Sequence, residues 1–107
     1  MRNTAYKGRM VDPVPLLIAL AEPTRLAALR LLWDGGEHCV CELMTKLGAS
    51  QSRMSRHTSA LKAAGLVGDR RDAQWVRYRL NPDLAERERA ILDAVMIAVP
   101  EPKRRAA

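Results

Sequence analysis

The chain contains no phenylalanine, and aromatic residues make up only 4 % of its 107 residues. Because 48 % of the residues are nevertheless hydrophobic, the core must be built mainly from aliphatic side chains. A single domain of this length buries only about 60–65 % of the surface that its unfolded chain exposes. We therefore expect one thin-cored domain over residues 1–107, with disordered tails at 1–12 and 101–107.

Long hydrophobic runs are also missing. The apolar run over residues 14–21 is short and is interrupted by Pro15, which does not fit a signal peptide. No stretch reaches the 18 or so apolar residues that a membrane-spanning helix needs. These absences predict a soluble, cytoplasmic protein without membrane association.

Cysteine is scarce, and its two copies lie one residue apart in the segment HCVCELM, residues 38–44. In the cytoplasm we expect Cys39 and Cys41 to be thiols or ligands of a soft ion, and not a structural disulfide. A direct bond between them would close a small, strained ring. An enzyme with a nucleophilic cysteine is disfavoured, because the chain has no Gly-rich phosphate loop, no nucleophile elbow and no evident acid partner for either histidine.

Acidic residues are rare between residues 50 and 80. Between residues 50 and 80 only two acids oppose seven basic residues, so this segment carries +5 of the total net charge of +6. Such a concentration is typical of a surface that binds a polyanion. The basic residues are Arg53, Arg56, Lys62, Arg70, Arg71, Arg77 and Arg79.

Apolar periodicity and stop signals predict five helices and one β-hairpin. The expected elements are a helix over Pro13–Leu20, a second from Pro23 to the stop at Gly35-Gly36, a third over Cys39–Leu47 ended by Gly48, a fourth capped by Ser50 and closed by Gly65, a hairpin over 66–80 that turns at 72–74, and a last helix from Pro82 to Val99. The short connection at Gly48-Ala49 makes the third and fourth helices a helix-turn-helix. The order predicts a mainly α winged helix-turn-helix domain with additional helices at both ends.

The fourth helix is predicted to have one apolar and one polar side. Met54, Thr58 and Leu61 define the side that faces the core, with His57 at its border. Small hydroxyl side chains around one arginine on the other side allow close approach to the major groove of DNA. The candidate contacts on this helix are Gln51, Ser52, Arg53, Ser55, Arg56, His57 and Ser59. His57 serves equally well as a hydrogen-bonded structural residue.

The arginines of the hairpin are candidates for contacts with DNA phosphates or the minor groove. They are Arg70, Arg71, Arg77 and Arg79.

A regular third helix would point Cys39 and Cys41 about 160° apart, so both thiols cannot hold one ion without distorting its first turn. Because this helix supports the fourth, ion binding and DNA binding are expected to oppose each other. Thiolates favour soft ions, and two cysteines alone do not complete a four-ligand zinc or iron–sulfur site. Met44 and His38 are possible third ligands, although Met44 fits simply as part of the apolar stripe.

The segment from His38 to Leu80 resembles the core of arsenical-resistance repressors of the ArsR/SmtB family, and the similarity extends from about Leu17 into the last helix. The motif CVCEL is typical of the arsenic-sensing branch, whereas SRH, GLV and YRL belong to the general DNA-binding region. The resemblance implies a homodimer formed through the first and last helices. It also implies repression of a resistance operon, with release of double-stranded operator DNA when trivalent arsenic or antimony binds.

Two departures from the family pattern qualify this expectation. Well-known arsenic sensors have a third cysteine where this chain has Met44, so a small thiol or hydroxide is needed as the third ligand, or another inducer acts. The last helix contains no histidine, which excludes the zinc site of the zinc-sensing branch. The alternatives left open are a repressor that responds to thiol oxidation or persulfide, and a sensor of another soft metal such as cadmium or lead.

Overall fold

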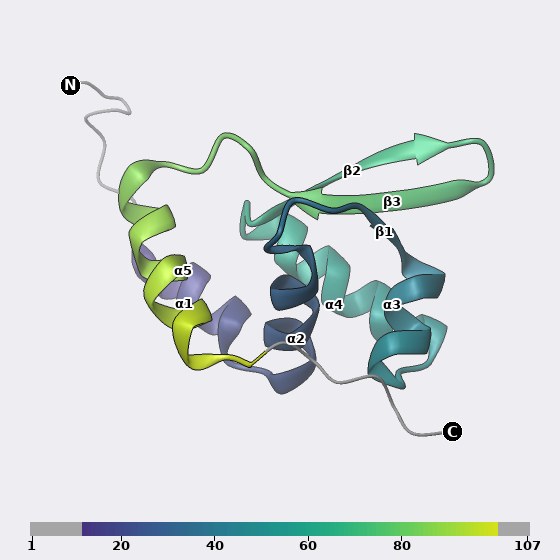
Figure 1. The fold of residues 1–107 in the computed structure, drawn as a ribbon, viewed down its shortest axis with the longest axis horizontal. Helices are drawn as coiled ribbons and strands as arrows, with labels where there is room; N and C mark the ends of the chain where they lie inside the picture. The colour runs from purple at the N-terminus through teal and green to yellow at the C-terminus, as the bar shows by residue number, and fades with distance from the viewer. Residues whose placement is uncertain (1–11, 101–107) are drawn as a thin grey trace.

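The computed structural model describes residues 12–100, so the tails expected at 1–12 and 101–107 lie outside the described residues except for Asp12. The elements are α1 (Pro13–Leu20), α2 (Pro23–Leu32), β1 (His38–Cys39), α3 (Val40–Leu47), α4 (Gln51–Ala63), β2 (Val67–Asp72), β3 (Trp75–Leu80) and α5 (Glu86–Ala98). Figure 1 shows the β2–β3 hairpin, called the wing below, extending along one side of the helices. This confirms the winged helix-turn-helix fold.

Local sequence signals explain where the helices begin and end. A proline occupies the first position of both α1 and α2, where its missing N–H and fixed φ cost nothing. Asp12, predicted to belong to a disordered tail, instead caps α1 by accepting a hydrogen bond from the backbone of Val14 (3.0 Å). Gly48 ends α3 in the left-handed conformation (φ 68°), which turns the chain sharply into α4.

One aliphatic core joins the helices to the base of the wing. Its fully buried large side chains come from α2, α3, α4, α5 and the start of the wing, namely Leu29, Leu32, Leu43, Met54, Thr58, Leu61, Leu66 and Leu92. The predicted inner side of α4 is confirmed by the burial of Met54, Thr58 and Leu61. This packing fixes which side of α4 remains exposed.

The sheet has three antiparallel strands in the order β1-β3-β2, whereas the sequence predicted only the hairpin. The additional strand pairs His38 with Tyr78 and Cys39 with Arg77. Two residues do not show the alternating pattern by which a strand is recognised, so β1 could not be predicted. The hairpin turns at Ala73, whose φ of 57° is unusual for a residue with a side chain.

Two helices begin later than the sequence predicts, α3 by one residue and α5 by about a turn. Helix α3 begins at Val40 and not at Cys39, because Cys39 is extended (φ −75°, ψ 164°) and its backbone N–H donates to the Glu42 carboxylate (2.8 Å). Helix α5 begins at Glu86 and not near Pro82, because Glu88 accepts a hydrogen bond from the N–H of Ala85 (3.2 Å). In both cases a glutamate in the first turn sets the start.

None of the helices within residues 12–100 has the length and the apolar run needed to cross a bilayer.

The core predicts that substitutions of buried residues lower the free energy of unfolding far more than substitutions of exposed residues. Leu43→Ala removes a fully buried side chain from α3 and should lower the free energy of unfolding by about 2–5 kcal/mol. Ser59→Ala, on the exposed side of α4, should change it by less than about 0.5 kcal/mol. Urea denaturation followed by circular dichroism measures both, and equal effects would contradict the assigned core.

Candidate functional site

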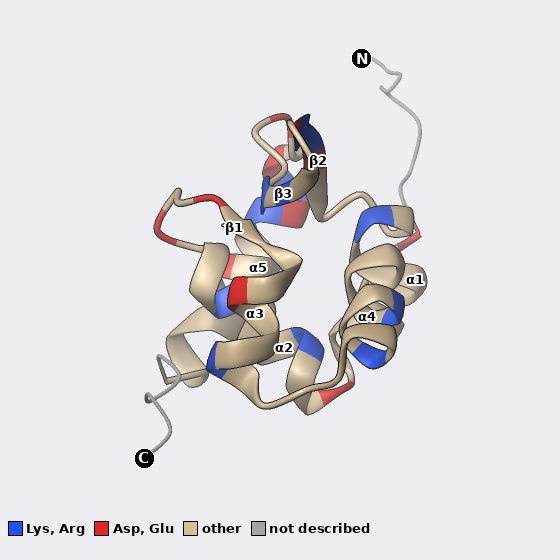
Figure 2. Ribbon diagram, turned by 90° about the vertical axis from the view of Figure 1, so that its right-hand side faces the viewer, with Lys and Arg blue, Asp and Glu red and all other residues tan. Residues whose placement is uncertain are grey.

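The exposed side of α4 carries most of the side chains predicted to contact DNA. Gln51, Ser52, Arg53, Arg56 and Ser59 are exposed, and Ser55 is half-buried. Figure 2 shows the basic positions of α4 spaced along the helix, away from the adjoining helices. The N-terminus of α4 is capped by Ser50, whose hydroxyl accepts from the N–H of Arg53 (3.3 Å). The helix is thus held by its inner side while its polar side is free.

His57 lies apart from this exposed group. Its ring is largely buried, with Nδ1 3.4 Å from the Arg25 guanidinium and Nε2 3.9 Å from the Glu22 carboxylate. Arg25 also donates to the carbonyl oxygens of Ala19 (2.6 Å) and Ile18 (3.2 Å). His57 therefore has a structural position between α4 and the junction of α1 and α2.

Two of the predicted wing arginines are engaged within the protein. The guanidinium of Arg70 donates to both oxygens of Glu37, at 2.8–3.0 Å. This hydrogen bonding holds the pKa of Glu37 below its usual range and raises that of Arg70. Arg77 donates to Asp72 (3.0 Å) and lies 3.9 Å from Glu42.

Lys62 donates to Asp69 (3.0 Å), whereas four other arginine side chains of this surface have no such partners. Within residues 12–100, the guanidinium groups of Arg53, Arg56, Arg71 and Arg79 make no hydrogen bond or ion pair. Arg53 and Arg56 belong to α4, and Arg71 and Arg79 to the wing. These four cations are free to bind an external anion.

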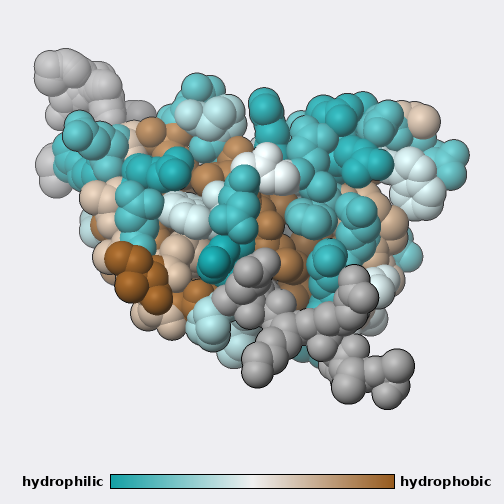
Figure 3. Space-filling model, in the orientation of Figure 1, coloured by the Kyte–Doolittle hydropathy of each residue, from teal (hydrophilic) through white to brown (hydrophobic). Residues whose placement is uncertain are grey.

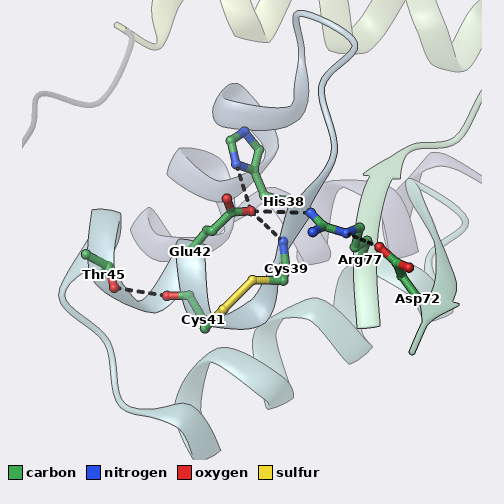
Figure 4. Close-up of a disulfide and its surroundings, with 7 residues drawn as sticks. All are labelled: His38, Cys39, Cys41, Glu42, Thr45, Asp72 and Arg77. Carbon is green, nitrogen blue, oxygen red and sulfur yellow. Dashed lines mark hydrogen bonds and ion pairs between the residues drawn. A yellow bond between two sulfur atoms is a disulfide. The ribbon is translucent and has the colours of Figure 1, made fainter. Parts of the chain in front are cut away.

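Cys39 and Cys41 form a disulfide, with their Cα atoms 5.3 Å apart. The prediction of separate thiols on opposite sides of a helix is wrong. Cys39 belongs to β1 and precedes α3, so the helical angle between positions i and i+2 does not apply to it. Figure 4 shows both sulfurs at the start of α3, where they meet without unwinding that helix.

Glu42 links the cysteine pair to the wing and was not identified from the sequence as a site residue. Its Oε1 atom accepts from the N–H of Cys39 (2.8 Å) and lies 3.6 Å from His38 Nδ1 and 3.9 Å from Arg77 Nη1 (Figure 4). Its spacing of three residues from Cys39 matches a capping box, and that pattern could have revealed both its role and the start of α3.

A pocket of about 390 Å³ opens beside the cysteine pair. It is bounded by the start of α3, the outer side of α4 and the end of the wing. Its lining comprises Cys39, Val40, Cys41, Met44, Gln51, Ser55, Gln74, Trp75, Val76 and Tyr78. The two sulfurs, two predicted DNA contacts and the hairpin tip therefore share one cavity.

The two candidate third ligands are placed differently. Met44 lines the same pocket as the cysteines and also packs against the core. The His38 ring pairs with Glu42, and in Figure 4 it lies on the far side of that carboxylate from the sulfurs. In the part of the chain that the structure describes, no three His, Cys, Asp or Glu side chains form a group able to hold a metal.

The terminal helices expose apolar side chains. Val14, Leu17 and Ile18 on α1 are 48–62 % exposed, and Ile97 on α5 is 87 % exposed. Figure 3 shows hydrophobic surface on the side of the molecule formed by α5, opposite the polar wing. Apolar residues exposed in this way are typical of a protein interface.

Comparisons with known proteins agree with this arrangement. The profile described as "Bacterial regulatory protein, arsR family" matches residues 22–68. The "Arsenic resistance transcriptional regulator ArsR2" of Pseudomonas putida is 47 % identical over 70 % of this chain and 65 % of its own length. The "Arsenical resistance operon repressor" of Escherichia coli is 43 % identical over 76 % of this chain and 69 % of its own.

A solved structure extends the similarity to three dimensions. "Reduced HlyU from Vibrio cholerae" superposes with a TM-score of 0.69 and 35 % identity, over 82 % of this chain and 88 % of that one. The family and these relatives are transcriptional regulators and not enzymes. The fold and the extent of the sequence identity together show that the chain belongs to the ArsR family of bacterial regulatory proteins.

Proposed function

We propose that the protein is a cytoplasmic transcriptional repressor that binds double-stranded operator DNA as a homodimer and dissociates when trivalent arsenic or antimony binds Cys39 and Cys41. The observation that carries the proposal is the shared cavity, which both cysteines line together with residues of α4 and of the wing. The arsenical-resistance names of the two bacterial relatives support the choice of inducer.

Helix α4 is suited to the major groove. Its outer side combines short hydroxyls with the free guanidinium of Arg56, which can bind guanine through two hydrogen bonds. Gln51, Ser52 and Arg53 lie in its first turn, the part of a recognition helix that reaches bases or backbone first. Ser55 and Ser59 complete the proposed contact surface.

The wing is suited to phosphate contacts. The side chains of Arg71 and Arg79 have no partner within the described residues, so we propose that they contact the DNA phosphates directly. Arg70 and Arg77, also predicted to contact DNA, must first exchange their carboxylate partners Glu37 and Asp72 for phosphates. Until that exchange Arg70 ties the wing to Glu37, which lies outside it, while the pair of Arg77 and Asp72 joins the two strands of the wing.

Strand β1 couples binding of the inducer at the cysteines to binding of DNA by the wing. Cys39 is paired with Arg77 of β3, and Glu42 contacts both residues. An arsenic atom that bridges the two reduced sulfurs would impose its own S–As–S spacing on Cys39 and Cys41, which would move the backbone that supports the wing. Binding of the ion to the displaced form then weakens DNA binding by the same coupling free energy. This replaces the strained-helix mechanism that the sequence predicted.

A thiol-oxidation sensor is the second candidate, and the disulfide of the structure favours it. Hydrogen peroxide would accept two electrons from the two thiols, its O–O bond would break, both thiol protons would leave in the two molecules of water formed, and one S–S bond would form. Forming that bond would change the spacing of Cys39 and Cys41, and β1, which pairs with β3, would transmit the change to the wing.

Substitution of the cysteines tests the inducer site. The reduced wild-type protein should leave its own upstream DNA on addition of arsenite, whereas Cys39→Ser and Cys41→Ser should remain bound because each retains only one thiolate. Fluorescence anisotropy of labelled DNA measures the release. If the double serine variant still dissociates with arsenite, the assignment is wrong.

The same assay separates the two candidate inducers. Arsenite added under anaerobic, reducing conditions should release the DNA if metalloid binding is the signal. Release by peroxide but not by arsenite would establish the oxidation sensor in its place.

Arginine substitutions test the two DNA-contacting surfaces. Arg56→Ala should cost about 1–3 kcal/mol at particular operator bases, because a base contact is lost. Arg71→Ala should weaken binding to all sequences and reduce the salt dependence by about one phosphate contact. Binding to a set of single-base operator variants at several salt concentrations checks both, and a uniform effect of Arg56→Ala would argue against base reading.

A charge placed on α1 tests the dimer. Ile18→Arg should convert the protein to monomers by burying an unpaired charge in the proposed interface, with little effect on folding since Ile18 is 62 % exposed. Light scattering after gel filtration measures the mass, and circular dichroism verifies the fold. A dimer of unchanged affinity would exclude this part of α1 from the interface.

A further inference from the structure

The chemistry of the cysteine pair leaves one bond of a trivalent arsenic atom without a protein ligand. Two thiolates occupy two of its three bonds. Among residues 12–100 no third acid, histidine or cysteine is grouped with them, and His38 is turned toward Glu42. The third substituent of the guest must therefore come from the guest itself or from a small molecule.

The space beside the sulfurs suits an organic group. Five lining side chains, those of Val40, Met44, Trp75, Val76 and Tyr78, are apolar or aromatic. At about 390 Å³ the pocket lies within the range of small-molecule sites. Its polar lining consists of the uncharged Gln51, Ser55 and Gln74, which offer no anionic ligand to a soft metal ion.

We propose that the preferred guest of the Cys39/Cys41 pair is a monosubstituted trivalent arsenical, R–As(OH)₂, whose organic group R occupies this pocket. The inference rests on the proposed function and names the ligand class of the same site. A dithiol reductant first converts the disulfide to two thiols and becomes a disulfide itself. Two As–O bonds then break and two As–S bonds form, both thiol protons leave with the hydroxyl groups as two molecules of water, and arsenic stays trivalent.

The position of R gives the guest a second means of acting on DNA binding. The pocket is closed on one side by Gln51 and Ser55 of α4 and on another by Trp75 of the wing. A ring held there contacts both α4 and the tip of the hairpin. The organic group therefore raises the affinity for the guest through apolar contact. By changing the distance between α4 and the wing, it also promotes release of the DNA.

The test measures binding to the DNA-free protein by calorimetry, after reduction and removal of the reductant under anaerobic conditions. The probes are phenylarsonous acid, methylarsonous acid and arsenite. Titration of a simple dithiol with the same compounds gives their intrinsic preferences. Relative to that dithiol, the protein should favour the phenyl over the methyl compound by a further factor of about ten, because the ring contacts Trp75 and its neighbours.

Two variants make the result specific. Trp75→Ala, at a side chain 45 % exposed, should lower the affinity for the phenyl compound more than the affinity for arsenite, and so remove most of the additional phenyl preference. Met44→Cys places a third thiol in the pocket and should strengthen arsenite binding at least about tenfold while reducing the phenyl preference. Circular dichroism establishes that both variants are folded.

The outcomes separate this inference from the proposed function. A phenyl-to-methyl ratio equal to that of the free dithiol, unaltered by Trp75→Ala, overturns the inference while arsenite-driven release of DNA still supports the repressor. Cysteine-independent binding of all three compounds overturns both. A ratio above that of the dithiol that falls in Trp75→Ala supports the organic guest.

Discussion

The pairing of β1 with β3 is the constraint on which the site depends. Two residues, His38 and Cys39, add a strand to the hairpin and hold the first cysteine in an extended conformation. This conformation delays the start of α3 by one residue and brings the second cysteine to the same place. Without the pairing, a helix running through both positions would separate the sulfurs. The strand therefore creates the cysteine pair and ties it to the DNA-binding wing at once.

The sequence predicts the large elements well because their signals are repeated and local. The prolines at 13 and 23, the glycines at 48 and 65 and the periodic apolar side chains of α4 agree on the helices and on their buried sides. The exposed polar side of α4 follows directly from the burial of Met54, Thr58 and Leu61. The winged helix-turn-helix order needs only these elements and the basic hairpin.

The parts of the site that were missed depend on contacts between distant segments. The pairing of Cys39 with Arg77 and the ion pair of Glu37 with Arg70 join residues more than 30 positions apart. No period or spacing reveals them. Because both arginines are held by carboxylates, charge counting also overstates the cations that the wing offers to DNA. Burial of His57 against α2 likewise depends on tertiary packing, so its position at the border of the helical wheel left two interpretations open.

The carboxylate of Glu42 shows how two parts of this surface become interdependent without any large movement. One of its oxygens faces the Cys39 amide, the His38 ring and the Arg77 guanidinium together, although an oxygen has lone pairs for about two good hydrogen bonds. The three groups are therefore competitors for one acceptor. Any event that strengthens the interaction of one group with this oxygen weakens the others, and the Arg77 guanidinium, which already donates to Asp72, then depends on Asp72 alone.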